Sequence, residues 1–161
     1  MTKAFGGKRT DTASKWIKAS AQTIYKAFVN PTALMSWLPP EGMEGHIEEF
    51  DVREGGVYRM TLTYVGADHS TPGKTSDHAD VVSGRFLKLV PGERIVQQVE
   101  FASEDPAFAG TMTMSWLLTE VHGGTEVTIL CENVPGGIRQ EDHDAGLKSS
   151  LENLAAFTEQ L

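Results

Sequence analysis

Size and charge place this chain among compact, acidic proteins. It has 161 residues, of which 40% are hydrophobic and 22% are charged, a balance that suits one folded unit with its own core. The 14 Lys and Arg stand against 22 Asp and Glu, so the formal net charge is -8. A nucleic acid or an anionic membrane surface would repel such a chain, so we expect neither as a partner.

The cysteine content and the lengths of the apolar segments indicate the cellular compartment in which we expect this protein. The single cysteine, Cys131, cannot form an intramolecular disulfide, and its isolation excludes Cys-pair metal and redox motifs. No stretch approaches the roughly 18 apolar residues of a membrane span, and the N-terminal residues lack the apolar core of a signal peptide. We therefore expect a cytoplasmic protein without a membrane span.

The first forty residues predict an arm, a strand and two short helices. We expect residues 1–11 to be a flexible N-terminal arm and residues 12–161 to form a single domain. Residues 12–19 favour a strand because they mix β-branched and aromatic types with polar ones. Ser20 can cap the helix that follows, and Pro31 favours the start of a second one, because proline suits the first helical position.

In the middle of the chain, apolar and polar residues alternate with the period of two that indicates strands. The glycine pairs at 55–56 and 123–124 favour tight hairpin turns, since both residues can adopt positive φ. Strands joined in this way run antiparallel. The six strands expected here are 46–52, 57–65, 80–90, 94–101, 110–121 and 125–132.

After residue 137 the apolar period changes to that of a long amphipathic helix, whose stripe includes Leu147, Leu151 and Leu154. The predicted fold is α+β: a curved seven-stranded antiparallel sheet around this C-terminal helix, with two short helices after the first strand. The C-terminal helix is the only large cover available for the sheet. Curvature leaves space between the two layers, which makes this interior the place to look for a ligand.

Five segments carry a resemblance to a known family. They are ASAQTIYKAFVNPTALMSWLPP, GGVYRMTL, GRFLKLVPGERIVQQVEF, GTMTMSWLLTEVHGGTEVTILCENVP and DHDAGLKSSLENLAAF. Their order and spacing resemble the SRPBCC (START/Bet v 1-like) superfamily, in the group similar to the C-terminal domain of the activator of Hsp90 ATPase. The resemblance implies a helix-grip fold with a hydrophobic cavity between the sheet and the last helix. Members often carry a Gly-Trp pair where this chain has Gly146-Leu147.

Apolar side chains that alternate along the strands form the candidate wall of that cavity. Met112, Met114 and Trp116 share one strand face, and methionine adapts well to irregular ligands. Ordinary core packing gives the same pattern, so both interpretations stay open. The candidate ligand-binding residues are Tyr58, Met60, Leu62, Phe86, Met112, Met114, Trp116, Ile129, Cys131, Leu147, Leu151 and Leu154.

Two groups of acidic and histidine residues stand out, in the loop at 66–80 and at 141–144. Their spacing matches no known divalent metal site, so we expect no metal and no cofactor. A solvated loop and an acidic helix start that complements the helix dipole would explain both groups. If the groups meet at the cavity mouth, a pairing of His78 with Asp142 or His143 would support acid-base chemistry. The candidate polar cluster at the mouth is His78, Asp80, Asp142 and His143.

Three functions follow from these expectations. The first is a small helix-grip protein that binds an unidentified hydrophobic or amphipathic small molecule. The second is a chaperone-associated module of the Hsp90 type with a role in stress response. The third is an enzyme similar to cyclases and aromatases, with Tyr58 or His78 as its acid-base group. We assign no catalytic residue, and the sequence leaves open whether the chain forms a homodimer through a sheet edge or the long helix.

Overall fold

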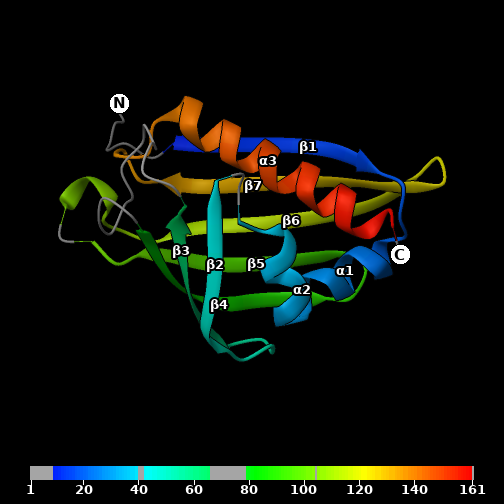
Figure 1. Cartoon of the computed structure of the whole chain (residues 1–161), viewed down its shortest axis with the longest axis horizontal. Helices are drawn as coiled ribbons and strands as arrows, with labels where there is room; N and C mark the ends of the chain where they lie inside the picture. The colour runs from blue at the N-terminus through cyan, green and yellow to red at the C-terminus, as the bar shows by residue number, and fades with distance from the viewer. Residues whose placement is uncertain (1–8, 40–41, 66–78, 104, 161) are drawn as a thin grey trace.

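Seven antiparallel strands curl around one long helix in the computed structural model, which describes residues 9–39, 42–65, 79–103 and 105–160 (Figure 1). The strand order is β1-β7-β6-β5-β4-β3-β2, so β1 and β2 are the two edges of the sheet. The α+β helix-grip architecture is confirmed. The elements are β1 (Arg9–Ile17), α1 (Ala21–Val29), α2 (Pro31–Trp37), β2 (Met43–Phe50), β3 (Val57–Tyr64), β4 (Ala79–Val90), β5 (Arg94–Phe101), a 3₁₀ turn (Pro106–Phe108), β6 (Met112–Val121), β7 (Gly124–Val134) and α3 (Gln140–Thr158).

Side-chain caps begin both short helices where the sequence predicts them. The backbone N–H of Thr23 donates to Ser20 Oγ at 3.1 Å at the start of α1. The N–H of Ala33 donates to Asn30 Oδ1 at 3.0 Å, and Pro31 occupies the first turn of α2. These bonds satisfy backbone donors that have no partner inside the helix.

Strand boundaries differ from expectation mainly at the edges of the sheet. β5 spans the expected residues, whereas β2 begins at Met43, three residues earlier than expected. β1 begins at Arg9, so residues 9–11 belong to the sheet and not to the expected arm. Pairing with β7, from Arg9 opposite Val134 onwards, holds these three residues in place. The rest of the expected arm, residues 1–8, lies outside the described residues.

A tight turn joins β6 to β7. His122 and Gly123 have φ of 52° and 78°, as a type I′ hairpin turn requires at its two central residues. The expected hairpin is confirmed. The two central residues of its turn are His122 and Gly123, which is a shift of one residue from the predicted pair at 123–124.

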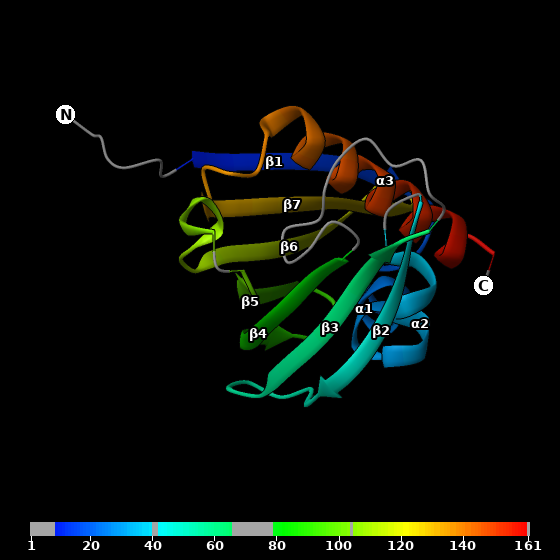
Figure 2. The same cartoon turned by 60° about the vertical axis from the view of Figure 1, so that its left-hand side comes forward.

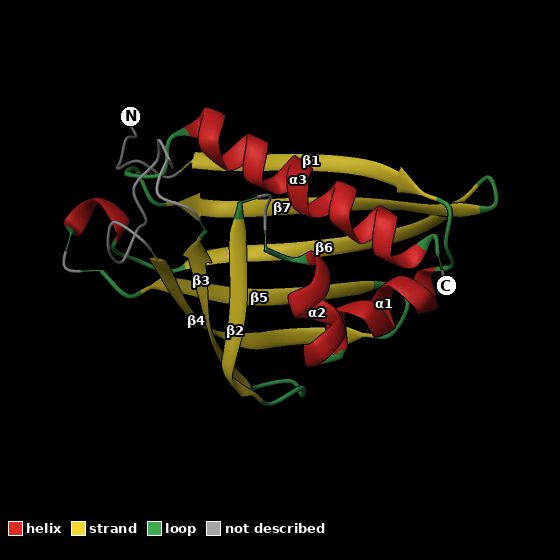
Figure 3. Cartoon of the chain, viewed as in Figure 1, coloured by secondary structure: helices red, strands yellow, loops and turns green. Residues whose placement is uncertain are grey.

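The sheet bends so that its two ends lie on different sides of α3. Irregular pairing interrupts the ladders between β1 and β7, between β2 and β3, and between β4 and β5, and such bulges increase local twist. In Figure 2, β2 and β3 run at a steep angle to β1 and β7. Helices α1 and α2 lie near the C-terminal end of α3, away from its N-terminal turns (Figure 3).

An aromatic cluster closes the interior at the end where α1 and α2 lie. Phe28, Trp37 and Trp116 pack with ring centroids 5.0 to 5.8 Å apart, mostly edge to face. The indole N–H of Trp37 also donates to the Ala27 carbonyl at 3.0 Å and so ties α2 to α1.

Of the helices in the described ranges, none is long and apolar enough to cross a membrane.

Candidate ligand-binding cavity

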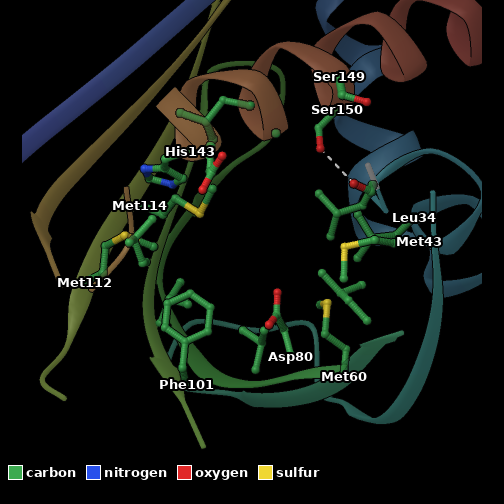
Figure 4. Close-up of a pocket in the computed structure, with 18 of the residues that line it drawn as sticks. Leu34, Met43, Met60, Asp80, Phe101, Met112, Met114, His143, Ser149 and Ser150 are labelled. Carbon is green, nitrogen blue, oxygen red and sulfur yellow. Dashed lines mark hydrogen bonds between the residues drawn. The ribbon is translucent and has the colours of Figure 1, made fainter. Parts of the chain in front are cut away.

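A cavity of about 640 Å³ lies between the sheet, α2 and the first turns of α3 (Figure 4). β3 to β6 form its floor and one side. α2 and α3 form the other side, where the Ser150 hydroxyl donates to the Leu38 carbonyl at 2.7 Å. This bond and a second from Asn153 to the Pro39 carbonyl join α3 to the end of α2. The wall is therefore held together by contacts between elements far apart in sequence.

Seven of the twelve apolar candidates lie on the cavity wall. The alternation of Met112, Met114 and Trp116 along β6 does turn all three toward the interior, as the period of two predicts. Whether the wall binds a ligand remains a prediction. The seven residues are Tyr58, Met60, Leu62, Met112, Met114, Trp116 and Leu147.

The other five candidates do not line the cavity, which corrects the prediction. All are buried, but they belong to solid core: Phe86, Ile129, Cys131, Leu151 and Leu154. Packing of α3 along β1, beside β7, explains why the β7 side chains and the later leucines of α3 lie away from the space (Figure 1). Phe86 instead contacts two aromatic rings, Phe50 at 5.7 Å and Tyr58 at 5.2 Å between centroids.

Several wall residues were not predicted from the sequence. Val82 on β4 and Val99 on β5 follow the inward alternation of their strands and were detectable in principle. Leu34 and Met43 line the cavity from α2 and the start of β2. No local pattern distinguishes these two from other apolar residues, because their role depends on how α2 sits against the sheet.

Three of the four polar candidates line the cavity. Asp80, Asp142 and His143 all line the space, while His78 lies outside the described residues. Tyr64 joins them from β3. Burial raises the pKa of Tyr64, and the nearby carboxylates of Asp80 and Asp142 raise it further. Two carboxylates, one from the sheet and one from α3, therefore approach the same phenol.

His143 has a partner that the sequence did not indicate. Its Nδ1 lies 2.7 Å from Asp11 Oδ2, and the Asp11 side chain is fully buried. Arg9 holds the same carboxylate through two nitrogens at 2.9 Å and donates to the Ile138 carbonyl at 2.7 Å. Asp11 falls within the segment expected to be an arm, which is why no sequence signal pointed to it.

The charge state of Asp11 follows from these contacts. Burial by itself raises the pKa of this carboxyl, but the hydrogen bonds from Arg9 and His143 outweigh it, so that the net pKa lies below its ordinary value. The carboxylate is thus ionised at neutral pH. It orients the imidazole of His143 at the cavity wall.

Tyr58 lies deep in the wall and keeps its proton. Its hydroxyl donates to the Gln98 carbonyl at 3.3 Å, and burial raises its pKa well above the ordinary value. At neutral pH this phenol is a hydrogen-bond donor with little acid-base capacity.

Within the described part of the chain, no three His, Cys, Asp or Glu side chains are grouped so as to hold a metal ion.

Comparison with known proteins gives the family of this fold. A model described as Activator of Hsp90 ATPase homolog 1-like protein matches residues 18–159, which is most of the chain. The chain belongs to the activator of Hsp90 ATPase homolog 1-like family. The resemblance noted from the five sequence segments is confirmed.

Solved structures share this fold. Protein CV1439 from Chromobacterium violaceum has a TM-score of 0.82 and 33% sequence identity, over 93% of this chain and 96% of that one. Protein Ms6760 from Mycobacterium smegmatis has a TM-score of 0.71 and 20% identity, over 91% of this chain and 88% of that one. The second likeness shows the fold alone. No curated protein matches the chain closely enough to count as a relative.

Proposed function

We propose that this member of the activator of Hsp90 ATPase homolog 1-like family binds a hydrophobic or amphipathic small molecule between its sheet and α3. The observation that carries the proposal is the cavity of about 640 Å³, within the range of about 300 to 1,000 Å³ common for small-molecule sites. Close packing normally leaves few interior voids larger than a water molecule. A space of this size therefore suits a ligand better than it suits a core.

The chemistry of the wall supports an apolar ligand body. Four methionines, Met43, Met60, Met112 and Met114, line the cavity together with valine and leucine side chains (Figure 4). Methionine is unbranched and polarisable, so it can adjust to ligands of different shape. The wall is suited to shape-tolerant binding of a chain or ring system.

Binding of a neutral fluorescent probe tests this function. We expect 1-aminoanthracene to bind the wild-type chain with a Kd in the micromolar range, and Leu147→Trp to weaken binding about tenfold, because the larger ring occupies part of the cavity. Leu147 lies on the wall, whereas Ala156 is an exposed residue of the same helix. Ala156→Trp is therefore the matched control and is expected to bind as the wild type does.

Two results would contradict the proposal. One is the absence of probe binding to the folded wild-type chain. The other is equal binding by wild type and Leu147→Trp when circular dichroism shows that both are folded. Native mass spectrometry of the purified protein adds the mass of any retained ligand and shows whether the chain is a monomer or a homodimer.

The family description favours a second candidate, contact with an Hsp90-type chaperone. If the chain acts in this way, the purified protein will raise the rate of ATP hydrolysis by such a chaperone in a dose-dependent manner. An unchanged rate at saturating protein would contradict it. Leu147→Trp separates the two functions, since a larger side chain at this buried position changes the cavity and leaves the outer surface intact.

A further inference from the structure

We propose that the ligand of this cavity, whose binding is itself the function proposed above, carries a neutral hydrogen-bonding group that the side-chain amide of Gln97 binds at the centre of the sheet. Molecules with a hydroxyl, a ketone or a carboxamide on an otherwise apolar body belong to this class. The inference comes from a buried amide on the cavity wall for which the described part of the chain holds no partner.

Gln97 belongs to the floor of the cavity. It lies in the middle of β5, the central strand of the sheet, and it lines the space. Its side chain lies on the same buried strand face as Ile95 and Val99, and the residue is only 6% exposed. Met114 on β6 and Phe86 on β4 are its cross-strand neighbours. The amide therefore lies among apolar side chains.

The amide of Gln97 is unpaired, yet it is not sealed inside the core. The structure shows no hydrogen bond between this side chain and any other described residue. In the described ranges the one fully enclosed side-chain polar atom without a partner is Trp116 Nε1, so the Gln97 amide keeps some accessible surface. Because Gln97 is almost wholly buried and lines the cavity, this surface faces the cavity. A ligand can therefore use one acceptor oxygen and two N–H donors there.

Two hydroxyl groups of the wall have already used their donors. The hydroxyl of Tyr58 donates to the Gln98 carbonyl, and that of Ser150 donates to the Leu38 carbonyl. Gln97 differs from both, since its amide donors are unused within the described residues. Buried polar groups nearly always have a partner, because an unpaired one costs stability. A ligand group that pairs with the amide removes this cost, whereas an apolar ligand would cover the amide and leave it unpaired.

A neutral group suits this amide better than a charged one. The amide has no charge, so it cannot by itself offset the cost of taking a carboxylate or an ammonium out of water. A hydroxyl or a carbonyl needs only one or two hydrogen bonds to replace its water. The floor of the cavity therefore selects for a neutral polar group on the ligand.

Two ligands that differ by one hydroxyl, fluorene and 9-fluorenol, provide the test. Each displaces 1-aminoanthracene from the complete chain at pH 7, below its solubility limit. In an apolar cavity without a partner, the hydroxyl would weaken binding about tenfold, because it loses its water. We expect 9-fluorenol to bind at least as tightly as fluorene, since Gln97 replaces that water. Weaker binding of 9-fluorenol would overturn this inference and leave the proposed small-molecule function standing. Failure of the probe and of both ligands to bind would overturn the proposed function itself.

Gln97→Met tests the assignment to the amide. Methionine has a similar length and volume but no amide, so we expect 9-fluorenol to bind about tenfold more weakly relative to fluorene, whose Kd stays within about twofold. Gln98→Met is the matched control, since Gln98 is the next residue of β5, is exposed and lies outside the wall. An unchanged ratio of the two Kd values in Gln97→Met, or an equal change in Gln98→Met, would contradict the role of Gln97.

Thermal unfolding separates ligand binding from support of the fold. Replacing an unpartnered buried amide by an apolar side chain should not lower the Tm. Gln97→Leu removes the same amide with a different shape, and it guards against a packing fault in Gln97→Met. We expect at least one of the two variants to keep the wild-type Tm and both to show the changed ratio. A lower Tm in both would show that the amide supports the fold, and would contradict this inference.

Discussion

His143 Nδ1 lies 2.7 Å from Asp11 Oδ2, which joins the first turn of α3 to the first strand of the sheet. The two residues are 132 positions apart in the sequence. Arg9 completes the network on the other side of the carboxylate. Because His143 also lines the cavity, this contact positions both the polar part of the wall and the start of the helix.

Because of the contacts of Asp11 with Arg9 and His143, the free energy of unfolding should depend on pH in the acid range. The folded chain holds the pKa of Asp11 below its ordinary value of 3.8, so the folded state binds this proton more weakly than the unfolded state does. The stabilisation is therefore present above about pH 4 and is lost as pH falls through the lowered folded pKa. We expect Asp11→Asn to reduce the free energy of unfolding by about 2 kcal/mol at pH 7, and the difference from wild type to shrink between about pH 4 and pH 2. Urea denaturation at a series of pH values measures this.

A double-mutant cycle provides the control for that prediction. Asp11→Asn, His143→Gln and the double variant are compared at pH 7, where we expect a coupling of about 1 kcal/mol between the two side chains. Additive effects would show that the contact contributes no coupling. A difference between Asp11→Asn and wild type that is as large at pH 2 as at pH 7 would contradict the linkage.

The two tryptophans of the aromatic cluster should respond differently to phenylalanine. Trp37 donates its indole N–H to the Ala27 carbonyl, whereas the buried N–H of Trp116 has no hydrogen-bond partner among the described residues. Both replacements remove the same volume, but only Trp37→Phe also breaks a hydrogen bond. We expect Trp37→Phe to cost about 1 kcal/mol more unfolding free energy than Trp116→Phe. Chemical denaturation decides between them, and an equal or larger cost for Trp116→Phe would refute the assignment.

Gly84 should be required for the position of Tyr58. These residues face each other across β3 and β4, and a Cβ at Gly84 would lie 2.4 Å from the Tyr58 ring and 2.2 Å from the Gln98 carbonyl oxygen. The backbone oxygen cannot move without disturbing the ladder, so we expect Gly84→Ala to destabilise the fold by about 3 kcal/mol. Gly136→Ala, with nothing within 4 Å of the added carbon, is the control and should change the stability by less than about 0.5 kcal/mol. Thermal or urea unfolding of both variants gives the comparison, and similar costs would contradict the steric explanation.

Cys131 should be unreactive until the chain unfolds. Its side chain is fully buried on β7, and burial, together with the charge of Asp11, raises the pKa of its thiol to about 12. The thiolate, which is the reactive form, is then scarce at pH 8. We expect a thiol reagent such as 5,5′-dithiobis(2-nitrobenzoic acid) to label the native chain at least about a hundredfold more slowly than the chain in urea. Rapid labelling without denaturant would contradict this prediction, because it would show that the Cys131 thiol is accessible in the folded chain.

Local sequence patterns were sufficient to predict the helices and strands of this fold. Ser20 and Asn30 cap helices through hydrogen bonds to residues three positions away, and the alternation along β6 places Met112, Met114 and Trp116 on one face. Such features depend on neighbours within a few residues, so they can be predicted from sequence. The number, order and direction of the main elements followed from them.

The composition of the cavity wall depends on tertiary structure instead. Leu147 and Leu151 lie on the same helical stripe, yet only Leu147 faces the open space, because the later turns of α3 pack against other elements. Asp11 became a partner of His143 only when β1 paired with β7 next to α3. Amphipathic period shows that a side chain is buried, whereas sheet curvature and helix placement decide whether it meets another side chain or a cavity.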